Sequence, residues 1–253
     1  MYADYIERKR DARALIKASL ADPTKRLLAC VMIYLTCTYL LSVLMSRMSG
    51  YSDYVTSLYR AVSNNIDPMT VAYPAVKPAA AVLAALIFIM SLVMETGFIS
   101  YSLRLTRGWD VQIRCLFDGF SVLHKAACIR IIQTLLCFAG YMLFIVPGLW
   151  FNYRYRFAIH IMFDHPEYSP IRCLRESARM THGKRFTLFT IDLSFLGWIL
   201  LNEMVTALFF PILDLWVTPY YGFTFAMIYN DLSSASVGAA AAPADTQRTE
   251  DNP

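Results

Sequence analysis

Long runs of apolar residues recur along the chain, and short stretches rich in lysine and arginine separate them. Residues 27–45 carry no charged side chain, and residues 79–103 carry one, Glu95. Each run is close to or above the roughly 20 apolar residues that a helix needs to cross the hydrocarbon core of a bilayer. Further runs of the same kind cover residues 126–146, 149–164, 186–210 and 213–229. The pattern therefore predicts an all-α, polytopic membrane bundle with six transmembrane helices.

Three segments outside these runs have the pattern of amphipathic helices at a membrane surface. Residues 1–26 combine apolar positions with seven lysines and arginines. Within residues 46–78, tyrosine and aliphatic side chains recur from Tyr51 onwards with the spacing of one helix face. Residues 170–180 follow Ser169, a residue type that caps helix N-termini, and precede a histidine and a glycine that end the helix. We expect all three segments to be interfacial helices.

The distribution of basic residues sets the expected orientation. Lysine and arginine are concentrated on the cytoplasmic side of membranes. The N-terminal segment and the five cations between Arg172 and Arg185 should therefore share that side. This arrangement requires a hairpin at Pro147 and Gly148, although the same two residues are compatible with a kink in one long helix. With the hairpin, six crossings leave both termini in the cytoplasm and residues 46–78 outside.

Composition also favours a membrane protein. Hydrophobic residues make up 57% of the 253 and charged residues 17%, whereas soluble domains have roughly 45–50% and about 25%. The net charge of +4 is modest and gives no indication of nucleic-acid binding. The six cysteines lack the spacing of a zinc site, and no cofactor is indicated. Residues 1–232 are expected to form one membrane domain, and residues 233–253, nearly free of large apolar side chains, a disordered tail.

Ionisable residues within the predicted helices are the first candidates for function, because charges at membrane depth are costly. They are Glu95, Arg130, Arg154, Arg156, Asp192 and Glu203. Asp192 and Glu203 are eleven residues apart and share one face of the fifth predicted helix. We expect two layers of charge pairs. In one, Asp192 lies near Glu95 and Arg130, and in the other Glu203 lies near Arg154. Buried ion pairs that fix helix packing and an ion or proton pathway both fit this pattern.

A second group of polar residues has atoms that could bind a metal. His160, Asp164 and His165 lie close in sequence, and the first two share one helix face. No further ligand accompanies them in the sequence, so the simpler interpretation is the polar end of a helix at the membrane interface. No metal site is predicted.

The predicted helix at residues 170–180 has one basic and one apolar face. The basic face is formed by Arg172, Arg175 and Arg179. The apolar face is formed by Ile171, Leu174 and Ala178. Each cation near an anionic membrane surface contributes about 1 kcal/mol, so anionic lipid headgroups are the expected partners. An ordinary positive-inside signal without a ligand explains the same residues, and a second copy of the chain or another membrane protein stays open as a partner.

No nucleophile elbow, HExxH zinc motif, Walker motif or dinucleotide fingerprint occurs in the sequence, so no enzymatic activity is predicted. The favoured hypothesis is a non-enzymatic membrane protein with a structural, lipid-interacting or partner-binding role. One alternative is a small transporter or permeation protein that uses the charges within the helices. The other is a membrane enzyme acting on lipid headgroups, for which Asp164, His165 and Asp192 are the first residues to test.

Several motifs from Gly97 to Asp231 occur in a specific order: SLRLTRGWDVQIRCLFDGF, then IVPGLWFNYRYRF, then DLSFLGW, then LWVTPYYGFTFAMIYNDL. In these motifs the chain resembles a bacterial family of integral membrane proteins, domain of unknown function 975. That family is similar to the membrane domain attached to some glycerophosphodiester phosphodiesterases, through the PG, Arg-Tyr and basic-helix region. The resemblance implies a multi-pass protein of the bacterial cytoplasmic (inner) membrane, and it implies no particular activity.

Overall fold

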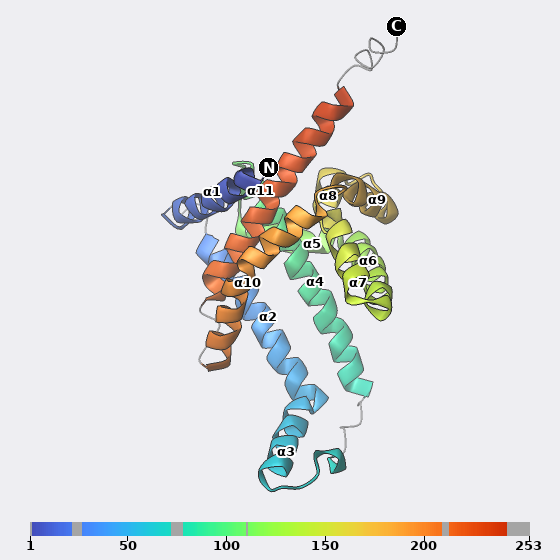
Figure 1. The fold of residues 1–253 in the computed structure, drawn as a ribbon. Coiled ribbons are helices and arrows are strands. Elements are labelled where there is room, and N and C mark those ends of the chain that lie inside the picture. The colour runs from blue at the N-terminus through green and yellow to red at the C-terminus, as the bar shows by residue number, and fades with distance from the viewer. Residues whose placement is uncertain (1, 22–26, 72–77, 110, 209–212, 242–253) are drawn as a thin grey trace.

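The computed structural model describes residues 2–21, 27–71, 78–109, 111–208 and 213–241. All regular secondary structure in these ranges is helical (Figure 1). The α-helices are α1 (Tyr2–Ala21), α2 (Leu27–Ser49), α3 (Tyr51–Ser63), α4 (Pro78–Thr106), α5 (Asp118–Ser121), α6 (Leu123–Leu143), α7 (Ile145–Arg154), α8 (Ala158–Asp164), α9 (Pro170–Met180), α10 (Arg185–Leu208) and α11 (Asp214–Ala241). Two short 3-10 helices, η1 (Pro68–Thr70) and η2 (Ile113–Phe117), lie in connecting segments. The predicted all-α class is confirmed for these residues.

Three helices are long and apolar enough to cross a membrane. The segments are Ala81–Thr106 of α4, Leu123–Leu143 of α6 and Arg185–Thr206 of α10, and α2 adds a shorter apolar segment, Ala29–Leu44. The predicted span at residues 213–229 falls in α11, which is not among them. A large part of α11 is instead core, with Tyr220, Phe223 and Tyr229 fully buried. Within the described residues, six transmembrane helices are therefore not supported.

The predicted span at residues 149–164 is wrong. The chain turns at residues 155–157, and this turn separates α7, with ten residues, from α8, with seven. Helices of this length rise only about 10–15 Å, half or less of the thickness of a hydrocarbon core. The break lies where Arg154 and Arg156 interrupt the apolar run, and α8 beyond it is almost entirely buried within the protein.

The chain reverses direction between α6 and α7. The reversal takes place at Phe144, whose backbone is extended with φ −165° and ψ 162°. The two arms pack closely because Gly140 and Gly148 face each other, and a Cβ on Gly140 would lie 2.9 Å from the Cα of Gly148. The structure thus has a hairpin and not a kinked helix. Its turn is at Phe144, and Pro147 lies within the first turn of α7.

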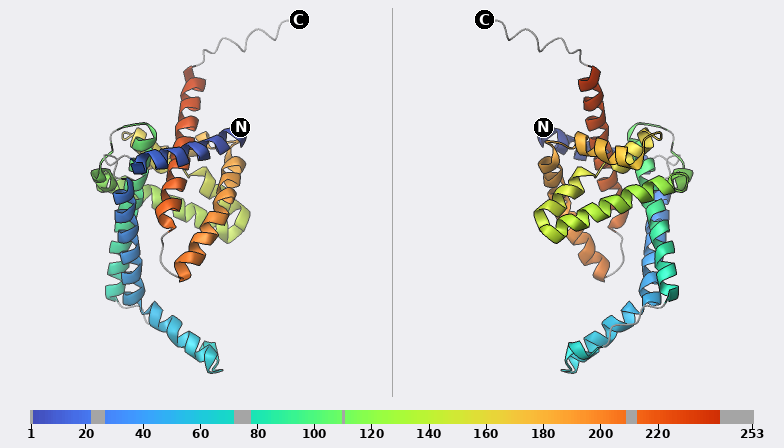
Figure 2. Two further views of the ribbon diagram at one scale, coloured as in Figure 1. Left: turned by 90° about the vertical axis from the view of Figure 1, so that its left-hand side faces the viewer. Right: turned by 90° about the vertical axis from the view of Figure 1, so that its right-hand side faces the viewer.

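The candidate spans are not arranged as a parallel bundle. α2 and α4 pack against each other along part of their length. Figure 2 shows that the hairpin of α6 and α7 runs across the direction of this pair. The position of the hairpin is set by close packing of α4 against the segment that precedes α6. A Cβ on Gly97 would overlap the carbonyl oxygen of Leu116, and a Cβ on Gly119 that of Val93. The predicted bundle architecture is therefore only partly realised.

The two ends of the molecule differ in character. α3 lies at one end, and α1 and α9 lie near the other (Figures 1 and 2). α3 exposes the side chains of Val55, Tyr59 and Val62, as a helix at a membrane interface would. The prediction of a helix within residues 46–78 is confirmed. The most basic helices, α1 and α9, share the opposite end.

α1 packs against α11 instead of lying alone on a surface. Its buried face includes Tyr5, Ala12 and Ile16. On the same side, the Arg8 guanidinium donates a hydrogen bond of 2.7 Å to Asp231 in α11. The expectation for residues 1–26 is corrected in this respect, because one face of the helix belongs to the protein core.

The expected disordered tail at residues 233–253 is helical in its first part. α11 continues as far as Ala241. Alanine has the highest intrinsic helix propensity, and alanine and serine dominate this stretch, so the absence of large apolar residues does not end the helix. Residues 242–253 lie outside the described residues.

Candidate functional site

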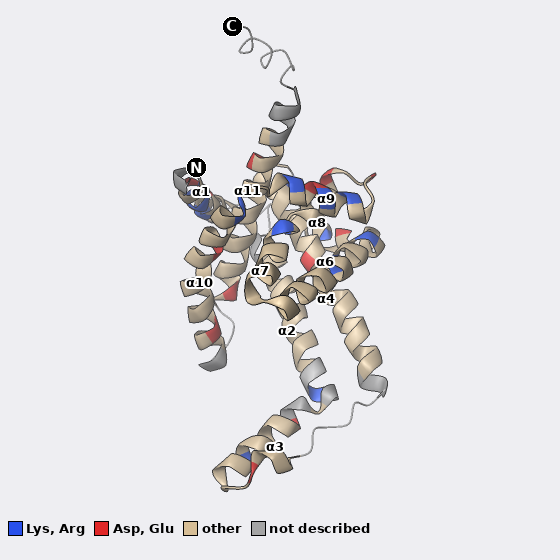
Figure 3. Cartoon of the chain, turned by 45° about the vertical axis from the view of Figure 1, so that its right-hand side comes forward, with Lys and Arg blue, Asp and Glu red and all other residues tan. Residues whose placement is uncertain are grey.

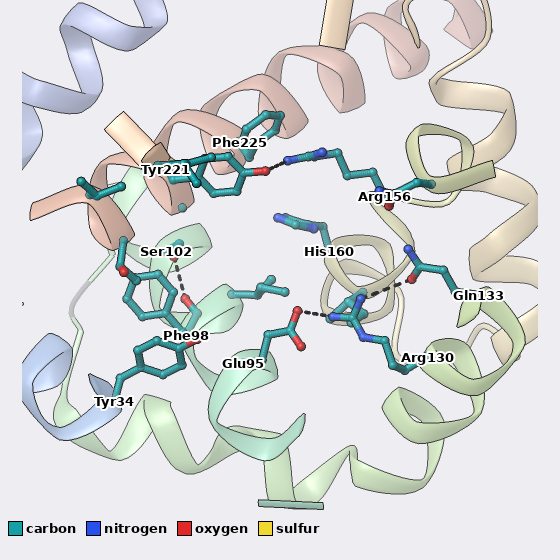
Figure 4. Close-up of a pocket in the computed structure, with 17 residues that line it drawn as sticks. Tyr34, Glu95, Phe98, Ser102, Arg130, Gln133, Arg156, His160, Tyr221 and Phe225 are labelled. Atoms are coloured by element: carbon teal, nitrogen blue, oxygen red, sulfur yellow. Dashed lines mark hydrogen bonds and ion pairs between the residues drawn. The ribbon is translucent and has the colours of Figure 1, made fainter. Parts of the chain in front are cut away.

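A cavity of about 480 Å³ lies where α2, α4, α6, α7, α8, α10 and α11 converge (Figure 4). Its polar lining includes Glu95, Ser102, Arg130, Gln133, Asn152, Arg156, His160 and Thr218. Its aromatic lining is formed by Tyr34, Phe98, Tyr221 and Phe225. The volume is in the range of small-molecule sites, which combine apolar walls with a few convergent polar groups. Three of the sequence-predicted charges, Glu95, Arg130 and Arg156, thus line one cavity.

Glu95 of α4 and Arg130 of α6 form an ion pair in one wall of this cavity. The Arg130 Nη1 atom also lies 3.5 Å from the buried Gln133 Oε1, one turn further along α6. The Glu95 carboxylate is half exposed, with 47% of its side chain accessible. The pair keeps the net charge of this wall at zero while leaving a carboxylate accessible from the cavity (Figure 4).

Arg156 and Asp192 form a second, more buried pair. Arg156 Nη1 donates to Asp192 Oδ2 at 2.7 Å, and Nη2 donates to Oδ1 at 3.2 Å. The Tyr221 hydroxyl donates to Asp192 Oδ1 at 3.0 Å, and the guanidinium lies 3.7 Å from the centre of the Phe225 ring. The turn between α7 and α8 directs Arg156 inward. The expectation that Asp192 has a basic partner is confirmed, but that partner is not Arg130.

His160 lies between these two pairs and points into the cavity (Figure 4). Only 7% of the residue is accessible, and its Nδ1 atom has no hydrogen-bond partner among the described residues. Burial, together with the positive charge of Arg156, lowers its pKa to about 3. The imidazole is therefore neutral at pH 7, and its Nδ1 atom is available for a hydrogen bond with a bound molecule.

Asp164 and His165, which also have atoms that could bind a metal, do not lie with His160 in the cavity lining. Asp164 accepts hydrogen bonds from Arg107 at 2.7 and 2.8 Å and from the Tyr229 hydroxyl at 2.7 Å. Burial by itself would raise the pKa of Asp164, but these hydrogen bonds outweigh it and lower the pKa. His165 is exposed and stacks on Tyr168. The three residues therefore have three separate environments.

Arg107 is a partner that the sequence analysis missed. It follows α4 directly and reaches residues in α8 and α11, where its Nε atom also donates to Asn230 at 2.9 Å. The spacing between Arg107 and Asp164 in sequence carries no periodic signal. Only the position of Arg107 at the end of a predicted span could have marked it as an interfacial anchor.

Arg154 and Glu203 do not form the expected pair. Arg154 lies over Trp150, with 4.9 Å between its guanidinium carbon and the ring centre. Glu203 is exposed on α10, and no ion pair of Glu203 occurs among the described residues. The expected proximity followed from the span at residues 149–164, which does not exist as one helix. This layer of the predicted charge network is therefore wrong.

α9 exposes its three arginines, Arg172, Arg175 and Arg179. Arg172 stacks on Tyr168 at 3.8 Å, and Arg179 pairs with Glu176 at 2.8 Å. The opposite face of the helix is buried and includes Leu174 and Ala178, whereas Ile171, expected on that face, is 62% exposed. The helix begins at the predicted residue, because Ser169 Oγ accepts a hydrogen bond from the Arg172 amide.

Charge is distributed unevenly over the molecule. Figure 3 shows lysine and arginine gathered on α1, on α9 and at the neighbouring ends of the helices, whereas the middle of α2 and of α4 carries almost no charge. Exposed basic residues are thus concentrated at the end of the molecule that contains α1 and α9.

Residues 125–236 match a family that is described as a protein of unknown function (DUF975). The matched segment begins in α6 and includes most of α11, so it contains α9 and most of the residues that line the cavity. No similar curated protein and no similar solved structure is found. The match supports the family resemblance and does not extend it to the membrane domains of glycerophosphodiester phosphodiesterases.

Proposed function

We propose that this chain is a multi-pass protein of the bacterial cytoplasmic membrane that has no catalytic role and interacts with anionic lipid through its basic end. The membrane assignment is supported by the three helices that are long and apolar enough to cross a bilayer. The proposed orientation places α1 and α9 in the cytoplasm and α3 outside, in keeping with the positive-inside rule. The separation of these helices to opposite ends of the molecule supports that orientation.

The observation that carries the lipid interaction is the exposure of the stripe on α9. Arg172, Arg175 and Arg179 are all exposed, while the other face of the same helix is fixed in the core. A stripe held in this way can meet a planar array of headgroups without refolding. Each cation adds about 1 kcal/mol near an anionic surface, and Glu176 offsets one of the three.

The proposed lipid interaction is tested by measuring which lipids remain bound around the protein. The protein is reconstituted in equimolar phosphatidylglycerol and phosphatidylcholine, extracted in polymer nanodiscs, and the retained lipids are quantified. We expect enrichment of phosphatidylglycerol, and loss of most of it in the triple variant R172Q/R175Q/R179Q. The variant R47Q/R60Q, which removes exposed cations near α3, is the control and should keep the enrichment.

A triple variant with undiminished enrichment would contradict the proposal. Equal losses in the triple variant and the control would also contradict it, because the effect would then belong to net charge and not to α9. Thermal unfolding of each variant in detergent verifies that the bundle is intact.

The central cavity supports a second candidate function, permeation of a small solute. It brings Glu95, Arg130 and Arg156 together in its lining. For this role the Glu95 carboxylate, half exposed, is the group that would meet a solute. Flux of a panel of small ions and metabolites into proteoliposomes, compared between the wild type and Glu95→Gln, tests it. Flux that is absent or unchanged by the substitution removes this candidate.

A further inference from the structure

Two arginines at the junction of α7, α9 and α10 share one aromatic ring and have no acidic partner within the residues that the structure describes. The guanidinium carbons of Arg154 and Arg185 lie 4.9 Å and 4.4 Å from the centre of the Trp150 ring. Both side chains therefore carry a positive charge near the same ring, and like charges repel each other most strongly where water is scarce. Trp150 is 40% exposed, so the junction is accessible from outside.

Five arginines that connect helices or neighbouring segments have a carboxylate partner, whereas these two have none within the described residues. Ion pairs between helices or connecting segments are formed by Arg8 with Asp231, Arg104 with Asp118, Arg107 with Asp164, Arg130 with Glu95, and Arg156 with Asp192. Neither Arg154 nor Arg185 is in an ion pair in the described part of the chain. Their buried Nε atoms have no hydrogen-bond acceptor in the described ranges, and Arg185 Nη2 donates to the Ala178 carbonyl at 3.3 Å.

The junction is rigid on the protein side. The Arg154 carbonyl accepts hydrogen bonds from the hydroxyls of Ser177 at 3.1 Å and Thr181 at 3.2 Å, which tie the end of α7 to α9. Arg185 is the first residue of α10 and also the first of its candidate span. Arginine and tryptophan at the end of a span are at the depth of lipid headgroups. The site therefore presents two fixed cations where phosphate groups are abundant.

We infer that Arg154 and Arg185 together bind one phosphate group beside Trp150, the ring that both guanidinium groups contact. Guanidinium matches phosphate because its parallel N–H groups donate to two oxygens at once. A phospholipid headgroup and free inorganic phosphate carry the same chemistry, and the position at the end of a span favours the lipid. The inference rests on the proposed membrane location but uses residues outside the α9 stripe.

Native mass spectrometry of the delipidated protein in detergent tests the inference. Titration with phosphatidylglycerol should give one adduct that forms before all others. The variant R154Q/R185Q should bind this first lipid about tenfold more weakly or worse. R172Q/R175Q removes the same charge from the exposed stripe and should change the first affinity by less than about twofold. R154K/R185K keeps the charge and should still weaken binding, because lysine lacks the planar fork.

A competition arm distinguishes the two sources of phosphate. Inorganic phosphate that displaces the first lipid at millimolar concentration identifies a site for the free anion, and lack of displacement identifies a headgroup site; either result supports a phosphate site. Equal weakening by R154Q/R185Q and R172Q/R175Q would overturn the inference, as would undiminished binding in R154Q/R185Q. The failure is distinguishable from failure of the proposed function, because lipid enrichment depends on α9 and is measured with the α9 triple variant.

Discussion

Arg154 and Arg156 are two residues apart, and they belong to two different regions of the molecule. Arg156 turns into the interior, where Asp192 and Tyr221 satisfy its guanidinium. Arg154 faces the junction at the basic end, where it lies on Trp150 beside Arg185. The interior charges of Glu95 and Arg156 are neutralised by residues distant in sequence, whereas Arg154 and Arg185 have no carboxylate partner within the described residues.

The difference shows which arginines are neutralised by carboxylates of the chain and which are not. The interior pairs fix the packing of α4, α6, α8, α10 and α11 around the cavity, and removal of one partner leaves an uncompensated charge. At the junction, removal of Arg154 or Arg185 leaves no carboxylate without a cation within the described residues. The same substitution should therefore affect stability in one region and lipid binding in the other.

The largest expected effect is on stability, from Arg156→Gln. Loss of the guanidinium leaves the Asp192 carboxylate, 21% accessible, without a cation, which costs about 3–5 kcal/mol for a buried pair. Arg154→Gln is the matched control and should cost less than about 1 kcal/mol, the value of a cation–π contact. Chemical or thermal unfolding in detergent measures both. Equal destabilisation by the two variants would remove the distinction between the regions.

The next largest effect on stability is expected at the hairpin of α6 and α7, which positions Arg154 and Arg156. Gly140→Val puts a Cβ 2.9 Å from the Cα of Gly148, so the arms must separate. Overpacking of this kind costs about 1–3 kcal/mol. Gly197→Ala in α10 is the control, since a Cβ there meets nothing within 4 Å and alanine favours the helix. A Gly140→Val protein as stable as the wild type would show that the arms are not in contact.

A smaller effect is expected from His160 and depends on pH. Its pKa of about 3 is below the ordinary value of 6.5, so its contribution to stability is present above pH 6.5 and is lost as the pH falls. Between pH 7.5 and pH 5.5 the loss is about 1.4 kcal/mol. Asp164 lowers this loss, whereas Arg156, Arg107 and Arg130 increase it.

The measurement compares the unfolding free energy of the wild type and His160→Phe at the two pH values. The pH dependence should be smaller in the variant by the amount given above. His165→Gln, at an exposed histidine, should retain the wild-type dependence. If His160→Phe responds to pH as the wild type does, the imidazole is not buried in its neutral form.

The smallest effect is expected at the surface of α9. Glu176→Gln breaks the pair with Arg179, whose side chain is 72% accessible, and exposed pairs contribute about 0–1 kcal/mol. Unfolding should be unchanged within about 0.5 kcal/mol. Retention of phosphatidylglycerol should rise, because the stripe gains an unpaired cation. Decreased retention would show that Glu176 orders the stripe instead of opposing it.

Long apolar periodicity predicted α2, α4, α6 and α10 well, because it depends on local sequence alone. It failed at residues 149–164, where two arginines within an apolar run were assigned to a membrane helix although the chain turns there. It also failed for α11, because the apolar run there consists largely of residues that pack in the protein core instead of facing lipid. A run of apolar residues does not distinguish these two environments.

The residues of the candidate site could be predicted from the sequence, but their pairing could not. The energetic cost of charged side chains at membrane depth identified Glu95, Arg130, Arg156 and Asp192 without knowledge of the fold. The partner of Asp192 depended on the turn between α7 and α8, which exposes Arg156 to α10. Arg185 was counted only as part of a positive segment, because the ring that it shares with Arg154 lies on another helix.

A cryo-electron microscopy structure in nanodiscs of phosphatidylglycerol would show directly whether Arg154 and Arg185 bind a phosphate group. We expect density for a phosphate group between the guanidinium groups of Arg154 and Arg185, and direct contact of Arg156 with Asp192 without any lipid. Arg154 or Arg185 paired with a carboxylate of the chain itself, with no phosphate density at the junction, would contradict it.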